Sequence, residues 1–130
     1  MFTIQQIKEA HSRVKSGADY PAYVQELIKM GVTGYTAYVA DGNVIYEGKN
    51  GFTTETGPKY AALSVANTAN NDEFTNRLRQ HQQGKTDYPT FCNDSAVTGV
   101  EKWVVSMAKM TCTYYDKAGN EMLQELIPAV

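Results

Sequence analysis

Two stretches of the sequence match each other and decide the fold: ADYPAYVQELIKMGV (residues 18–32) and TDYPTFCNDSAVTGV (residues 86–100). Asp-Tyr-Pro occurs near the start of both, 68 positions apart, and Gly-Val closes both. The same offset relates five further pairs: Tyr23 with Phe91, Tyr35 with Trp103, Tyr46 with Tyr114, Lys49 with Lys117, and Gly51 with Gly119. A repeat at a fixed offset predicts two copies of one unit, each of about sixty residues.

Local signals predict two helices at the start of each copy. A capping box at Thr3 opens the first helix, and Gly17 is placed to end it. Pro21 lies in the first turn of a second helix, where its missing N–H costs nothing, and Gly31 ends that helix. The second copy repeats this pattern, with helices expected over residues 71–84 and 87–99.

Stretches rich in β-branched and aromatic residues follow each helix pair. Asp41-Gly42 is a strong two-residue hairpin signal between residues 35–40 and 43–47. In the second copy we expect strands over residues 103–107, 110–115 and 122–127. Residues 60–67, which follow the break at Gly57-Pro58, are predicted to form a strand that connects the copies.

These elements predict an α+β fold in which two pseudo-symmetric α-α-β-β-β repeats form one mostly antiparallel sheet with helices packed on one face. A half of about sixty residues buries too little surface to be stable alone, so we expect one domain over residues 1–130. Repeat one is expected to span about residues 3–56 and repeat two about residues 70–127.

Composition and charge exclude several classes of protein. The 130 residues are 42% hydrophobic and 20% charged, as in an ordinary globular protein, and the formal net charge is −2. This charge argues against nucleic acid as a partner. No apolar run is long enough to span a membrane, and the first residues do not form a signal peptide, so we expect a cytoplasmic protein without membrane insertion. We expect no cofactor.

A weak catalytic hypothesis centres on Cys92, which lies one turn into a predicted helix whose N-terminal end would lower the pKa of a thiol. His81, on the preceding helix, or His11 would be its base. The alternative is that Cys92 is buried and that both histidines are core residues on apolar helix faces. The histidines lack the regular spacing of metal ligands, so no metal site is expected.

The repeated aspartates, Asp19 and Asp87, allow two interpretations. A pair of carboxylates near a pseudo-two-fold axis can serve acid–base chemistry. An aspartate directly before a helix start also caps that helix, and this structural interpretation is the stronger one.

The surplus of aromatic residues in the predicted strands is the best indication of function. Because side chains alternate along a strand, Tyr35 and Tyr38 should lie on opposite faces of the sheet, as should Tyr114 and Tyr115. Exposed tyrosines would form a binding platform, whereas high β-propensity alone would also explain them. The candidate binding residues are Tyr35, Tyr38, Tyr46, Trp103, Tyr114 and Tyr115.

The segments GKTDYPTFC (residues 84–92), GVEKW (99–103) and TCTYYD (111–116) resemble a family of small uncharacterised bacterial proteins, many of which are labelled "phage envelope protein". Residues 7–12 and 39–42 extend the resemblance over nearly the whole chain. The resemblance implies no established activity, cofactor or site residue, and its label suggests a prophage-derived origin.

Two functions remain open from the sequence. The favoured one is a noncatalytic binding or assembly module that uses the aromatic sheet face or the groove between the repeats for a protein partner or a small ligand. Repeated units commonly descend from homodimers, so a homo-oligomer is also expected. The alternative is a small thiol-dependent or acid–base hydrolase that uses Cys92 with His81 or His11.

Overall fold

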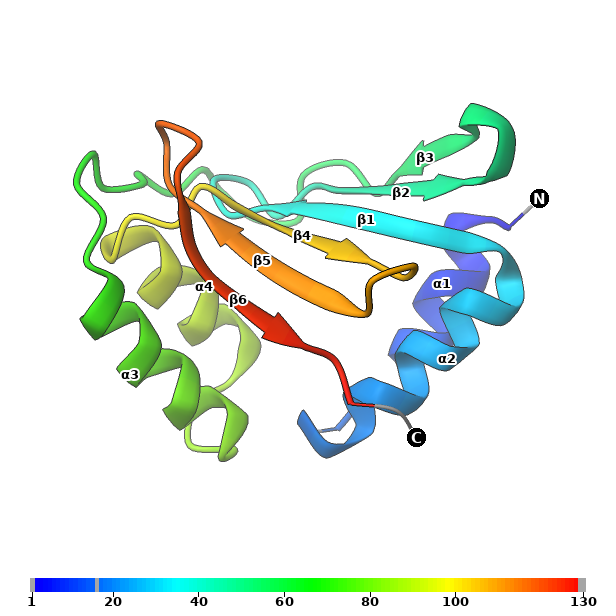
Figure 1. Cartoon of the computed structure of the whole chain (residues 1–130), viewed down its shortest axis with the longest axis horizontal. Coiled ribbons are helices and arrows are strands. Elements are labelled where there is room, and N and C mark those ends of the chain that lie inside the picture. The colour runs from blue at the N-terminus through cyan, green and yellow to red at the C-terminus, as the bar shows by residue number, and fades with distance from the viewer. Residues whose placement is uncertain (1, 16, 129–130) are drawn as a thin grey trace.

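The computed structural model describes residues 2–15 and 17–128, in which the chain forms helices packed against one antiparallel sheet (Figure 1). The α-helices are α1 (Ile4–His11), α2 (Tyr20–Met30), α3 (Asn71–Gln82) and α4 (Tyr88–Val97). The strands are β1 (Val32–Tyr38), β2 (Val44–Gly48), β3 (Thr53–Glu55), β4 (Lys102–Ser106), β5 (Thr111–Tyr115) and β6 (Glu121–Leu126). Short 3₁₀ turns cover Gly17–Asp19 and Lys49–Gly51. None of the helices in these described residues could cross a membrane.

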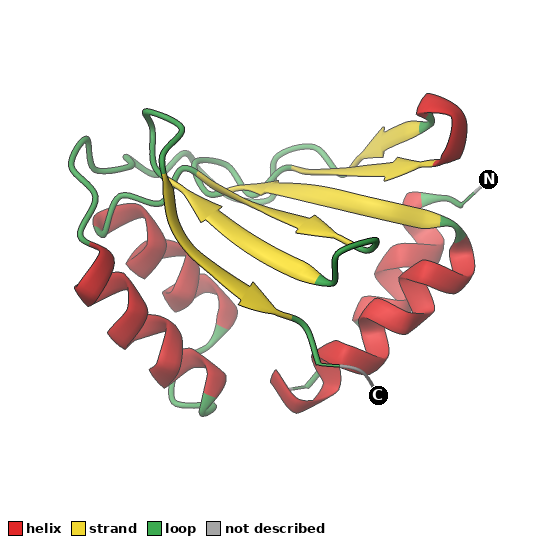
Figure 2. Cartoon of the chain, in the orientation of Figure 1, coloured by secondary structure: helices red, strands yellow, loops and turns green. Residues whose placement is uncertain are grey.

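The sheet has the strand order β3-β2-β1-β4-β5-β6, and every neighbouring pair is antiparallel. The order of two helices and three strands therefore occurs twice, and the two half-sheets join at the central pair β1 and β4. Both helix pairs lie on the same side of the sheet (Figure 2). The predicted fold class is confirmed.

Alternation along the central strands directs apolar side chains to the helices. Tyr35 lies opposite Val105, and Ala37 lies opposite Trp103; all four side chains are buried. Leu27 of α2 and Phe74 of α3, both fully buried, pack over this face. The core is therefore continuous across the junction between the two halves.

The first helix begins where the sequence predicts and ends earlier. The Thr3 hydroxyl accepts the N–H of Gln6 at 3.2 Å, and the Gln6 side chain accepts the N–H of Thr3 at 2.9 Å, which completes the capping box. The helix ends at His11, where the Ser12 hydroxyl donates to the carbonyl of Glu9 and competes with the helical backbone. Gly17 starts the next turn instead of ending α1.

The strand predicted over residues 60–67 is wrong, because this segment bonds to several elements in turn. Leu63 donates its N–H to the carbonyl of Ala40, beside the β1–β2 turn, whereas Ala66 donates to Ala96 at the end of α4. The Tyr60 hydroxyl donates to the carbonyl of Val39 at 2.6 Å. Residues 56–70 therefore form an irregular segment that contacts the end of α4 and leads from the first half into α3.

Matched backbone positions share left-handed conformations. Gly31 and Gly99, which end α2 and the turn after α4, have φ of 101° and 94°. Gly42, in the β1–β2 turn, has φ of 78°, and the position 68 residues later is Met110, with φ of 51°. The turn is therefore kept in the second copy even though methionine replaces the glycine that favours it.

Candidate functional site

The structure divides the six predicted binding aromatics between the two faces of the sheet. The split of Tyr35 from Tyr38 and of Tyr114 from Tyr115 is confirmed: the first of each pair is buried, and the second is half-buried on the open face. Four of the six side chains point toward the helices and are less than a tenth exposed: Tyr35, Tyr46, Trp103 and Tyr114. On the open face, Lys102 lies between Tyr38 and Tyr115, with its Nζ 5.8 Å from the Tyr115 ring.

The tyrosines on the helix side form a neutral hydroxyl cluster. The hydroxyls of Tyr20 and Tyr35 share a hydrogen bond, and Tyr23 and Tyr46 interact through theirs. Burial is the main reason why the pKa of each of these four groups lies above the usual tyrosine value. These side chains therefore stay protonated at neutral pH and act as hydrogen-bond groups.

The structure does not bring the predicted catalytic residues into a catalytic arrangement. Cys92 is 1% exposed, and burial raises the pKa of its thiol above the usual value, although interactions with Tyr60 and Tyr88 lower it. His81 Nδ1 lies 3.1 Å from the Thr86 carbonyl, and its ring stacks on Phe91 at 4.5 Å. In the described chain no hydrogen bond joins His81 to Cys92.

Among the described residues no hydrogen bond joins His11 to Cys92, although the charge of Lys59 affects both side chains. The His11 ring packs edge-on against Tyr23, with the ring centroids 5.2 Å apart. Within residues 2–15 and 17–128, no group of three His, Cys, Asp or Glu side chains converges as metal ligands would.

The two repeated aspartates have different partners. Asp87 caps α4 by accepting the N–H of Thr90 at 2.9 Å, and hydrogen bonding by the side chain and the backbone of Thr90 lowers the pKa of the Asp87 carboxyl. Asp19 makes no such cap and accepts the N–H of Lys15 at 2.8 Å. Capping therefore accounts for Asp87, and a local turn accounts for the bond that Asp19 makes.

Cys92 is among the residues that line a pocket between the irregular segment and α4. The pocket has a volume of about 520 Å³ and a mostly apolar wall. Its lining residues are Lys59, Tyr60, Ala61, Leu63, Tyr88, Pro89, Cys92 and Asn93. We call this hollow the α4 pocket. Both halves of the chain build it, since the segment after β3 supplies one wall and α4 supplies the other.

A difference between the two repeats explains why Tyr88 is available to this pocket. Tyr20, which matches Tyr88, is held by its bond to the Tyr35 hydroxyl. The position that matches Tyr35 is Trp103, whose indole offers no hydroxyl and packs against Phe91. Tyr88 instead lies against Cys92 and is 40% exposed.

A basic group borders the apolar wall of the α4 pocket. Lys59 lies in the wall, and its charge lowers the pKa of His11 in addition to the larger effect of burial. Burial lowers the pKa of Lys59, the neighbouring Cys92 raises it by a smaller amount, and the charge of Lys8 lowers it. Lys8 and His11 are three residues apart on α1 and therefore share a helix face. We call these three side chains the basic rim.

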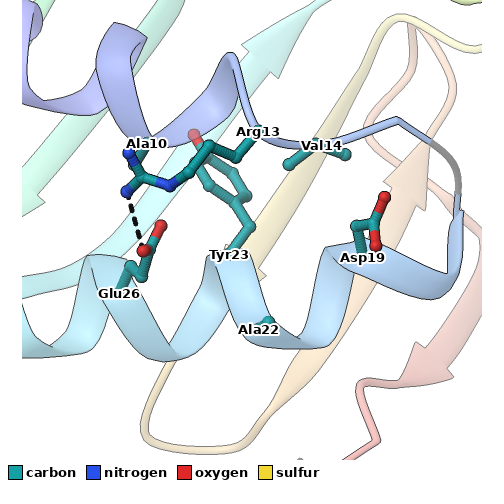
Figure 3. Close-up of a pocket in the computed structure, with 7 residues that line it drawn as sticks. All are labelled: Ala10, Arg13, Val14, Asp19, Ala22, Tyr23 and Glu26. Carbon is teal, nitrogen blue, oxygen red and sulfur yellow. Dashed lines mark hydrogen bonds and ion pairs between the residues drawn. The ribbon is translucent and has the colours of Figure 1, made fainter.

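A second hollow, of about 220 Å³, lies between α1 and α2 (Figure 3). Arg13 and Glu26 form an ion pair at 2.7 Å on one side of it, and Asp19 accepts the Lys15 N–H at the other. Because its charged groups already have these bonds within the protein, the α4 pocket is the better candidate for a ligand.

Sequence reasoning singled out Cys92 but missed the residues around it. Lys59 and Tyr60 lie far from α4 in the sequence, and Tyr60 begins the segment that was expected to be a strand. The one available signal was the break at Gly57-Pro58, which marks the start of an irregular segment.

The fold and the pocket define a small α+β protein with one antiparallel sheet, helices on one face and a pocket shared by the two repeats. A family model described as a protein of unknown function (DUF1398) matches residues 8–126, and the chain belongs to this family. Curated proteins include no match to the chain.

Proposed function

We propose that this protein is a noncatalytic binding module that holds a small ligand in the α4 pocket. The observation that carries the proposal is the pocket itself: its volume of about 520 Å³ lies within the usual range for ligand sites. An apolar wall with a few polar groups, here Lys59 and Asn93, is the usual composition of such a site.

The state of Cys92 supports binding over catalysis. A nucleophilic thiol needs a lowered pKa and a base, whereas burial raises the pKa of Cys92 and its polar neighbours are the phenols of Tyr60 and Tyr88. His81 and His11 interact with other groups. The hydrolase alternative therefore has less support than the binding module.

Filling the pocket tests the proposal. Ala61 and Ala62 are adjacent and both exposed, but only Ala61 lines the pocket. We expect saturation-transfer NMR with a library of small aromatic fragments to detect binding to the wild-type protein. The signals should disappear for Ala61→Trp, because the indole occupies the pocket, and persist for Ala62→Trp.

Circular dichroism of both variants should show the wild-type fold, since neither alanine is buried. Fragment binding that is equally strong in both variants, or absent from the wild-type protein, would contradict the proposal.

Several expectations from the sequence stay predictions. They are the cytoplasmic location, the prophage origin suggested by the family label, a protein partner and self-association. Native mass spectrometry of the purified chain checks self-association directly, and the argument for the α4 pocket does not depend on any of them.

A further inference from the structure

We propose that the ligand of the α4 pocket is a small organic acid, whose apolar body lies against Leu63 and Tyr88 and whose carboxylate faces Lys59. This inference rests on the proposed function and adds the chemical class of the ligand.

The charges at the pocket favour an anion. In the described part of the chain, the ion pairs involve Arg13, Arg77 and Arg79, and none involves a member of the basic rim. Lys59, which lies in the pocket wall, therefore forms no ion pair within the described residues. A carboxylate there would offset the charge of Lys59 and would form a charge-assisted hydrogen bond with its ammonium.

The acidic groups nearby are directed to other partners. The charge of Asp41 reaches Tyr60, but its Oδ1 accepts the N–H of Asn43 at 2.9 Å. Asp87, at the start of α4, accepts the N–H of Thr90 and interacts with His81. Because the Asp87 carboxylate already occupies the helix N-terminus, a ligand anion is better placed at Lys59 than at that end of α4.

The size and polarity of the site point to a singly charged ligand. Lys59 is the one cation among the described lining residues, and the rest of the wall is mostly apolar. A doubly charged phosphate ester is usually held by arginine forks or by several backbone N–H groups. A monocarboxylate with an aromatic or branched body fits one ammonium beside Leu63, Tyr60 and Tyr88.

A pair of probes separates this inference from the proposed function. Phenylacetate and phenylacetamide have nearly the same shape and differ in charge. We expect phenylacetate to bind about fivefold more tightly in an NMR titration, since one partly exposed charge pair contributes up to about that factor. Lys59→Met, which keeps the apolar stem, should remove the preference, whereas Lys109→Met, on an exposed turn, should keep it.

Equal or tighter binding of the amide to the wild-type protein would overturn the inference and leave the pocket as a site for neutral ligands. An unchanged preference in Lys59→Met would overturn it as well. In a third outcome, neither probe binds, but other fragments bind to the wild-type protein and not to Ala61→Trp. This result would reject an organic acid as the ligand and would still support the proposed function.

Discussion

At the scale of single residues, Cys92 shows how burial can make a cysteine thiol unreactive. A thiolate buried in an apolar region loses its hydration, so the neutral thiol is favoured. The hydrogen-bonding interactions with Tyr60 and Tyr88 and the charge of Lys59 act in the opposite direction, but burial is the largest effect on the pKa of Cys92. The residue therefore serves as part of a pocket wall.

Alkylation kinetics test this description of Cys92. At pH 7 we expect iodoacetamide to modify Cys92 at least about tenfold more slowly in the native protein than in urea, because burial limits both access and the thiolate fraction. Cys112 is the internal control, since it is also buried and burial raises the pKa of its thiol to about 12. Mass spectrometry after proteolysis would assign the labels. Rapid native labelling of Cys92 alone would restore the nucleophile hypothesis.

The candidate site was only partly predictable at this scale. Cys92 stands out in the sequence because cysteine is rare in the chain and lies near a helix start. Its neighbours Lys59 and Tyr60 carry no local signal, because their role depends on where a long irregular segment packs. Tyr88 is available to the pocket because Trp103 has no hydroxyl that could bind it. This difference becomes informative only once the hydrogen bond between Tyr20 and Tyr35 is known.

At the scale of elements, Gly31 and Gly99 occupy matched positions in different surroundings. Both have left-handed backbone conformations, which favour glycine. A side chain at Gly31 would meet no atom within 4 Å, whereas a Cβ at Gly99 would lie 2.7 Å from the Ala69 Cα and 2.9 Å from the Thr68 carbonyl oxygen. Gly99 thus allows the irregular segment to pack closely on the turn after α4.

Replacing each glycine by alanine separates the energetic cost of a left-handed backbone from the cost of a steric clash. We expect Gly31→Ala to lower the free energy of unfolding by about 1 kcal/mol, the cost of a left-handed alanine. Gly99→Ala should cost roughly 3 kcal/mol or more, because a clash with rigid backbone is added. Urea denaturation measures both. Equal losses in the two variants would show that the contact with residues 68–69 is not rigid.

The elements with local signals were predicted well, and the element without them was not. The capping box and Gly31 at the end of α2 act within a few residues, so the sequence reveals them. Asp41-Gly42 locates the connection between β1 and β2, but this connection covers residues 39–43 instead of the two residues expected. Residues 60–67 contain apolar residues typical of a strand, but their hydrogen bonds go to separate partners that only the tertiary structure provides.

At the scale of the whole molecule, the β1–β4 pair makes the two halves depend on each other. The pair forms the centre of the sheet, and the core residues of both halves are continuous beneath it. We therefore expect the protein to unfold as one cooperative unit. The sequence repeat predicted that the two copies share one sheet, but it did not determine which strands meet, because that pairing depends on tertiary packing.

A core deletion in the first half tests this cooperativity. Leu27 of α2 is fully buried, so Leu27→Ala should lower the free energy of unfolding by about 2–5 kcal/mol. The single tryptophan, Trp103, lies in the second half and should report the same lowered midpoint as far-UV circular dichroism. Trp103 fluorescence that keeps the wild-type midpoint would show that the halves unfold separately.

The matched positions of Tyr20 and Tyr88 have a consequence for how such a protein can change. When the same residue occurs at two matched positions, one can keep its structural role while the other changes. In the first half, the hydrogen bond to Tyr35 keeps Tyr20 in a structural role. In the second half, Trp103 stands in place of Tyr35 and has no hydroxyl, so Tyr88 can take another role. A change at position 103 would therefore alter the surroundings of Tyr88, and with them the proposed binding site, without removing the contact between Tyr20 and Tyr35.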